Sequence, residues 1–179
     1  CLPFFYYNMH VSPATCHSTL NDVPPTFGVN YSMNSYQLDP CLDVNCLECR
    51  WNSYDYCNAC QTGWAVNWNT DARCYEVPNG IPDGYGIEPT SNPFYLNACS
   101  VSNCLRCRDD CYVCQVCEPG FGLRGTDNVC YDAANMPDGH GLDLTTSNPT
   151  LVVPCLSSNC KICTANRLIC TECNTTYHL

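Results

Sequence analysis

The stretch "CLDVNCLECRWNSYDYCNACQTGWAVNWNTDARC" (residues 41–74) decides the fold, because it holds six cysteines in 34 residues. Their spacing is C-x4-C-x2-C-x7-C-x2-C-x13-C, and we label them a to f in chain order. From Cys99 the spacing is C-x4-C-x2-C-x6-C-x2-C-x12-C, and from Cys155 the same pattern runs as far as cysteine e. An Asn precedes cysteine b each time. This self-similarity predicts a tandem array with a period of 56 to 59 residues.

The linkers between repeats are equally regular. Each cysteine f is followed by 24 residues before the next cysteine a. Two linkers contain "PDGYGI" (82–87) and "PDGHGL" (137–142), and an earlier one contains the related "PPTFGV" (24–29). Pro, Asp and Gly in this order predict a tight turn. The apolar stretches "YQL", "FYL" and "LVV" before each cysteine a predict brief strands, and no sustained helical period is present.

Four segments follow from the repeat. Residues 1–40 are the tail of a preceding repeat with its linker, 41–98 and 99–154 are repeats with linkers, and 155–179 begin a third repeat. Cys1 aligns with cysteine e and Cys16 with cysteine f. We therefore expect the chain to be a window on a longer array. The predicted fold class is small and disulfide-rich, with short β-strands and turns, almost no helix, and an elongated rod shape.

Composition points to an oxidising, extracellular compartment, secreted or at the cell surface. Twenty of 179 residues are cysteine, which is the level of disulfide scaffolds in secreted chains. The net charge is −10 and Lys161 is the single lysine, which argues against nucleic acid as a partner. No apolar run is long enough to insert into a membrane. The sequons at Asn30 and Asn174 predict N-linked glycans.

The cysteines allow three interpretations. In the first, the cysteines form disulfides that stabilise small repeats with too few aliphatic residues for a core. In the second, the CxxC pairs bind zinc, and in the third, one CxxC is redox-active. The gap of six or seven residues between CxxC pairs is short for zinc sites, and the helical context of a redox CxxC is absent. The spacing thus favours structural disulfides.

The pattern resembles furin-like, or growth-factor-receptor, cysteine-rich repeats. The resemblance lies in the cysteine spacing and in a Gly-aromatic-x-aliphatic cluster after cysteine e, seen in "CQTGWAV" (60–66) and "CEPGFGL" (117–123) and, without the glycine, in "CNTTYHL" (173–179). "CEPGFGLRGTDNVC" (117–130) is also similar to the end of an EGF-like module. Long arrays of this kind are similar to those of protist surface and appendage proteins.

Both families imply the pairing a–c, b–d and e–f. Carried over, this gives Cys1–Cys16, Cys41–Cys49, Cys46–Cys57, Cys60–Cys74, Cys99–Cys107, Cys104–Cys114, Cys117–Cys130, Cys155–Cys163 and Cys160–Cys170. Sequence alone leaves other pairings open. One rival joins b to d, c to e, and f to the next a, so that Cys74 would pair with Cys99.

Two cysteines are left over by this pairing. Cys173 is a cysteine e whose partner would follow residue 179, and Cys111 is an insertion in one repeat. For Cys111 we consider a free or locally reshuffled thiol near Cys107 and Cys114, or an intermolecular disulfide.

No other residues form a recognisable site. The four histidines His10, His17, His140 and His178 are scattered, and no nucleophile or phosphate-loop motif occurs. Asp83, Glu88, Asp138 and Asp143 in the linkers offer a calcium alternative, although Asp is also a common turn residue. We predict that the protein is not an enzyme and needs no cofactor.

The function expected from these observations is structural. A low-charge, glycosylated repeat array with uniform linkers suits a filament, appendage or cell coat, in which the partners are neighbouring repeats or further copies of the chain. The alternative is the stalk or ectodomain of a surface receptor or surface antigen that binds a protein ligand.

Overall fold

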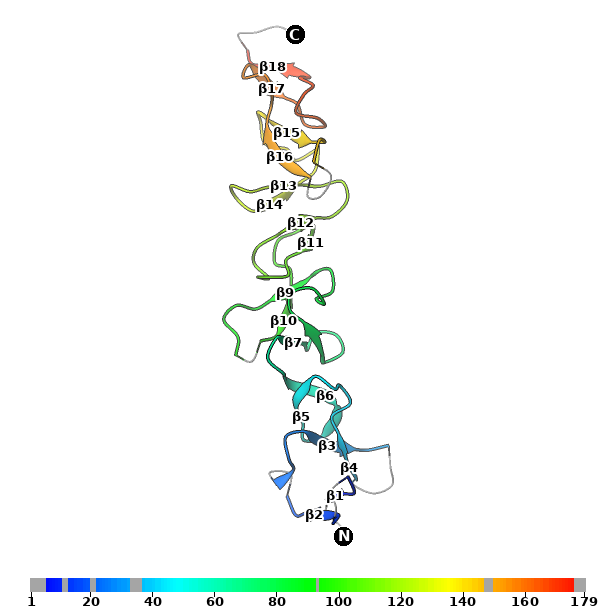
Figure 1. Cartoon of the computed structure of the whole chain (residues 1–179). Coiled ribbons are helices and arrows are strands. Elements are labelled where there is room, and N and C mark those ends of the chain that lie inside the picture. Colours follow the sequence, from blue (N-terminus) through cyan, green and yellow to red (C-terminus); the bar gives the residue numbers. More distant parts are fainter. Residues whose placement is uncertain are drawn as a thin grey trace. The chain divides into compact units, whose positions relative to one another are not determined.

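The fold is built from short β-strands, as seen in a computed structural model (Figure 1). The structure describes residues 6–10, 13–19, 22–32, 37–92, 94–146 and 150–175. No α-helix occurs among these residues, as the sequence predicts. The strands are β1 (Tyr6–Asn8), β2 (Thr15–His17), β3 (Phe27–Asn30), β4 (Gln37–Pro40), β5 (Cys46–Arg50), β6 (Ser53–Cys60), β7 (Trp64–Asn67), β8 (Arg73–Glu76), β9 (Tyr85–Ile87), β10 (Leu96–Ala98), β11 (Cys104–Arg106), β12 (Val116–Cys117), β13 (Gly122–Arg124), β14 (Val129–Tyr131), β15 (His140–Asp143), β16 (Leu151–Pro154), β17 (Cys160–Ile162) and β18 (Glu172–Cys173).

Spatial contacts divide the chain into two compact units. The first contains residues 1–81 and 87–97, and the second contains 82–86 and 98–179. These units are defined by spatial contacts, whereas the four segments of the sequence analysis are defined by cysteine spacing. The two divisions do not test one another, so the four segments stay a prediction. In the first unit the apolar core consists of few side chains, among them Val29, Leu38, Val66 and Leu96, each 1% exposed or less.

The segment between cysteines e and f forms a hairpin. β1 pairs with β2, β7 with β8, and β13 with β14, all antiparallel. Ala72 and Asn128, just before the returning strand, have positive φ values of 52° and 57°. A tyrosine after cysteine f closes the turn, because Tyr75 and Tyr131 donate through their hydroxyls to Asp71 and Asp127 at 2.8 and 2.7 Å.

The linker forms a second hairpin, which pairs with the first. β3 pairs with β4 and β15 with β16, both antiparallel, and β9 and β10 form a two-stranded sheet. β4 runs parallel to β1, and β16 runs parallel to β13. The results are four-stranded sheets in the order β2-β1-β4-β3 and β14-β13-β16-β15. The linker is therefore half of a sheet, and its inner strand lies at the apolar stretch that precedes cysteine a.

The predicted turns are present in the linkers. Tyr85 N donates to Pro82 O at 3.2 Å, and His140 N donates to Pro137 O at 3.1 Å. Gly84 and Gly139, the third residues of these turns, have φ values of 85° and 72°. Only glycine adopts this conformation without a steric penalty.

Each of these turns docks onto the repeat that follows it. Gly84 N donates to Leu105 O and Gly139 N to Lys161 O, both at 2.7 Å. In return, Cys99 N donates to Gly84 O and Cys155 N to Gly139 O, both at 2.8 Å. In the earlier linker Cys41 N donates to Thr26 O at 3.0 Å. The cysteine a of each repeat is thus held by the turn before it.

The second glycine of PDG-x-G is required by packing. A Cβ on Gly86 would lie 1.9 Å from Cys107 O, and one on Gly141 would lie 2.2 Å from Cys163 O. Cys107 and Cys163 are both cysteine c of the following repeat and are at most 1% exposed. Backbone contact at this distance leaves no room for a methyl group.

This close contact gives a stability prediction. Gly141→Ala places a methyl group against the Cys163 carbonyl, so we expect a loss of about 1–3 kcal/mol in unfolding free energy. Gly125→Ala is the matched control, because a Cβ there meets no atom within 4 Å. We expect it to change stability by less than about 0.5 kcal/mol. Denaturant melts of the oxidised proteins measure both, and equal effects would contradict the docking role.

Candidate functional site

The eight disulfides are the dominant chemical feature of the described residues. They are Cys41–Cys49, Cys46–Cys57, Cys60–Cys74, Cys99–Cys107, Cys104–Cys114, Cys117–Cys130, Cys155–Cys163 and Cys160–Cys170. These are the pairs that the resemblance to cysteine-rich repeats implies, and the rival Cys74–Cys99 bond is not formed. The predicted Cys1–Cys16 pair lies outside the described residues, since Cys1 does.

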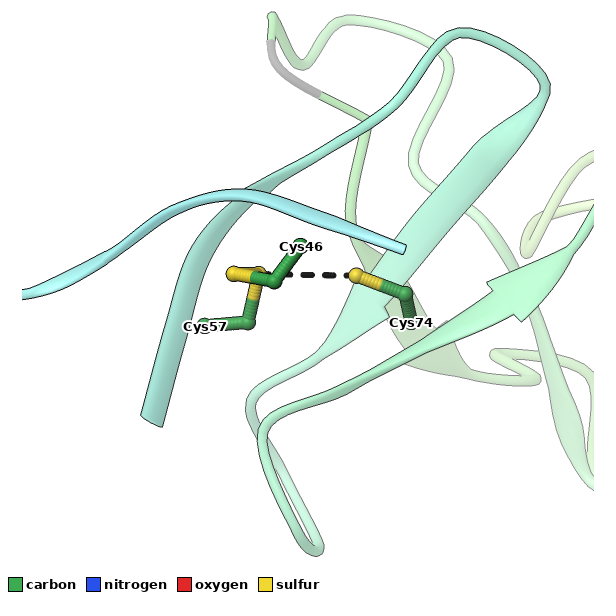
Figure 2. Close-up of side chains that lie close together, drawn as sticks. All are labelled: Cys46, Cys57 and Cys74. Carbon is green, nitrogen blue, oxygen red and sulfur yellow. Dashed lines mark hydrogen bonds between the residues drawn. A yellow bond between two sulfur atoms is a disulfide. The ribbon is translucent and has the colours of Figure 1, made fainter. Parts of the chain in front are cut away.

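Two disulfides of a repeat touch each other. Cys57 Sγ, which is bonded to Cys46, lies 3.4 Å from Cys74 Sγ, which is bonded to Cys60 (Figure 2). The next repeat brings Cys114 Sγ and Cys130 Sγ to 3.6 Å. In both repeats cysteine d therefore contacts cysteine f inside the small core.

The same sulfur atoms bear on the zinc interpretation. Among the described residues, two groups could hold a metal ion by their proximity: Cys46, Cys57 and Cys74, and Cys114, Cys117 and Cys130. All six of these sulfurs are in disulfides. Zinc binds the thiolate form of cysteine, so metal binding here would first require reduction.

The remaining cysteines have different surroundings. Cys111 stands outside the eight disulfides, and its side chain is 1% exposed in a cluster with Cys107 and Cys114. A sulfur so deeply buried is not presented to a second chain, which weighs against the intermolecular alternative. Cys173 is half-buried, has no disulfide partner in the described part of the chain, and lies opposite Cys160 in the β17–β18 ladder.

The acidic linker residues are engaged in local polar contacts. Asp83 accepts from Arg106 at 2.9 Å and from Arg108 at 3.3 Å, and the Arg106 contact holds the pKa of its carboxyl below the usual range. Asp143 accepts from Thr145 and from Arg167, and the Thr145 hydrogen bonds lower its pKa.

The other two acidic linker residues make different contacts. Glu88 accepts from Thr90 at 2.8 Å and from Asn97 at 3.1 Å. Asp138 contributes its backbone oxygen to a contact with the His140 ring at 3.0 Å. None of the predicted calcium residues belongs to a group of metal-ligand atoms within the described ranges. The geometry therefore adds no support for a calcium site.

The histidines do not form a catalytic arrangement within the described ranges. His10 pairs with Asp39 at 2.9 Å, His17 contacts the Thr15 hydroxyl at 3.2 Å, and His140 contacts a backbone oxygen. His178 lies outside the described residues.

Three polar residues are buried at equivalent places in the linkers, and the sequence analysis, which considered them as sequon or calcium residues, did not predict this burial. Asn30, Glu88 and Asp143, each six residues after the proline that opens its linker turn, are 9%, 4% and 8% exposed. Each accepts through its side chain from the Ser or Thr two residues later. The signal was present as Gly-Val-Asn, Gly-Ile-Glu and Gly-Leu-Asp in aligned linkers, and its last residue lies at the end of the first linker strand or directly after it.

The two sequons differ in environment. Asn30 Nδ2, the atom to which a glycan would be attached, donates to Asp39 at 2.6 Å. Asn30 Oδ1 accepts from the backbone and side chain of Ser32. Asn174, in contrast, is exposed at the end of the described chain, and its backbone N donates to Asn159 O at 2.9 Å.

This difference predicts which sequon carries a glycan. When the chain is secreted from eukaryotic cells, Asn174→Gln should remove one glycosidase-sensitive glycan, and Asn30→Gln should leave the mass of the glycoprotein otherwise unchanged. Mass spectrometry before and after enzymatic deglycosylation measures this. A glycan on Asn30 of the folded protein would contradict this prediction.

Asp39 is the centre of a polar network in the first unit. It accepts from Asn30 at 2.6 Å, from Gln37 at 2.8 Å and from His10 at 2.9 Å. Partial burial alone would raise the pKa of this carboxyl. The three hydrogen bonds outweigh that effect and lower the pKa below its ordinary value of 3.8.

The lowered pKa predicts a loss of stability in acid. A carboxylate whose pKa is lower in the folded than in the unfolded state stabilises the fold above the ordinary value of 3.8, and this stabilisation is lost as the pH falls through the folded-state pKa. Asp39→Asn should therefore flatten the acid limb of a stability-versus-pH curve for the first unit. An unchanged acid limb would rule out Asp39 as a contributor.

Comparison with protein-family models, with curated proteins and with solved structures finds no match. No helix in the described part of the chain is long and apolar enough to cross a membrane. The molecule is a disulfide-rich, all-β cysteine-repeat protein. Disulfides at this density are typical of extracellular or secreted proteins.

Proposed function

We propose that this chain belongs to an extracellular structural repeat protein that forms or coats a filament, appendage or cell coat. The observation that carries the proposal is the docking of each linker turn onto the repeat that follows it. The turns at 24–29, 82–87 and 137–142 all hold the next cysteine a through a backbone hydrogen bond. A linker that is folded and docked transmits order between repeats, as a structural array requires.

The chemistry of the chain supports a structural rather than an enzymatic role. Two ion pairs of the described residues join linkers to the repeats that follow them, Asp83 with Arg106 and Asp143 with Arg167. A surface with few charges suits packing against neighbouring copies, and a glycan at Asn174 would help to keep it soluble. The proposal includes a secreted or cell-surface location, which the number of disulfides supports.

The finer family proposal is that these repeats are of the furin-like, growth-factor-receptor type, with the disulfide logic of EGF-like modules. The pairing a–c, b–d and e–f supports it. Arrays of this type in surface and appendage proteins of protists are the proposed setting.

A surface receptor or antigen that binds a protein ligand is the second proposal. One observation favours it, a hollow of about 510 Å³ in the first unit that is lined by Leu42, Val44, Asp55, Asp71 and Arg73 among others. Val44 is 84% exposed there. Exposed apolar side chains beside carboxylates would suit a ligand that carries both apolar and basic groups.

Electron microscopy of the native material tests the main proposal. We expect antibodies against residues 41–154 to decorate polymers or a continuous coat outside the cell. Matched samples treated with a strong reductant should lose this order, because the repeats depend on their disulfides. Dispersed monomers alone would overturn the structural proposal, and specific binding of such monomers to a soluble protein would support the receptor alternative.

A further inference from the structure

The contact between two disulfides in the repeat 41–74 places a third sulfur beside an intact disulfide. Cys74 Sγ lies 3.4 Å from Cys57 Sγ and within 4.8 Å of Cys46 Sγ (Figure 2). Cys74 is held there by β8, which pairs with β7, and Cys57 by the long strand β6. A sulfur at van der Waals distance from a disulfide is placed for thiol–disulfide exchange once it becomes a thiolate.

Burial decides which sulfur a solvent thiol can reach. Cys46, Cys57 and Cys74 are 7%, 2% and 8% exposed. Cys60, the partner of Cys74, is half-buried. Attack from solvent is therefore directed to Cys60, and the sulfur expelled is that of Cys74.

We propose that Cys46, Cys57, Cys60 and Cys74 form an internal thiol–disulfide exchange site whose substrate is a small thiol. The thiolate of that small thiol attacks Cys60 Sγ, forms a mixed disulfide there, and breaks the Cys60–Cys74 bond. The Cys74 thiolate then attacks Cys57 Sγ, forms a Cys57–Cys74 bond, and expels Cys46 as a thiolate that takes up a proton. Two disulfides and one thiol are present before and after, so nothing is oxidised or reduced overall.

The next repeats provide internal comparisons. Cys114 and Cys130 repeat the contact at 3.6 Å, but there Cys117 is 7% exposed, which shields the entry sulfur. In the third repeat the equivalent b–d disulfide, Cys160–Cys170, has no cysteine f among the described residues. We therefore expect the exchange to be faster in the repeat 41–74 than in the repeat 99–130.

Two single variants test the proposal in the full chain. Cys60→Ser and Cys74→Ser each remove the same disulfide and leave one thiol, so they lose the same covalent constraint. In Cys60→Ser the remaining Cys74 thiol touches Cys57, and we expect a Cys57–Cys74 bond with alkylating label on Cys46. In Cys74→Ser the remaining Cys60 is not one of the three cysteines whose sulfurs lie within 4.8 Å of one another, and we expect an intact Cys46–Cys57 bond with label on Cys60.

The measurement is alkylation at mildly alkaline pH, acid quenching, non-reducing digestion and mass spectrometry. Label on Cys74 with Cys46–Cys57 intact in Cys60→Ser would overturn the proposal, as would the same shift of label to Cys46 in both variants. Wild-type protein with limiting glutathione provides a second test that does not depend on folding of a variant. Glutathione on Cys60 with label on Cys46 supports the proposal, whereas thiols at Cys60 and Cys74 alone overturn it.

Discussion

The constraint on which this structure depends is the shortage of aliphatic residues that could form a core. In the described part of the chain the fully buried side chains larger than cysteine include only a few, such as Leu38, Ile81 and Leu96. Burial of so few groups cannot offset the conformational entropy of ordering the backbone. The disulfides close loops of 8 to 14 residues, and each adds roughly 2–3 kcal/mol by restricting the unfolded chain. Sulfur thus replaces the hydrocarbon of an ordinary core.

Among the described residues, all of the disulfides lie within single repeats and none joins one repeat to the next. The linker hairpins provide the additional strand pairing that extends the short strands of each repeat. Strands as short as β1 or β13, with three residues each, are marginal as isolated hairpins. Parallel pairing with β4 and β16 extends them to four-stranded sheets. The same linkers hold the next cysteine a through their turns, so that the sheet and the disulfide knot within each unit stabilise one another.

Much of this arrangement was predictable from residue chemistry, and the rest depended on contacts distant in sequence. Pro, Asp and Gly in "PDGYGI" predict the turn, since each favours a backbone conformation by itself. Nothing local distinguishes Gly86, which is a packing glycine, from Gly84, which is a turn glycine; only the approach of Cys107 separates them. The parallel pairing of β13 with β16 was likewise beyond prediction, because strands of three or four residues carry no usable periodicity.

For the disulfides, too, the sequence predicted one part of the arrangement and the structure was needed for the other. The resemblance implies which cysteines bond, but not that one disulfide covers another. Cys57 and Cys114, the d cysteines of the complete repeats, are 2% and 3% exposed, while Cys170 at the equivalent place is half-buried. In the repeats 41–74 and 99–130 the e–f hairpin packs its cysteine f against cysteine d. The closed hairpin therefore shields the b–d disulfide, which lies earlier in the same repeat. The e–f disulfide thus both holds the hairpin together and covers the b–d bond. The b–d disulfide of such a repeat resists attack by thiols best when the e–f hairpin is closed. The covalent state of the disulfides is therefore coupled to the folding of the adjoining sheet.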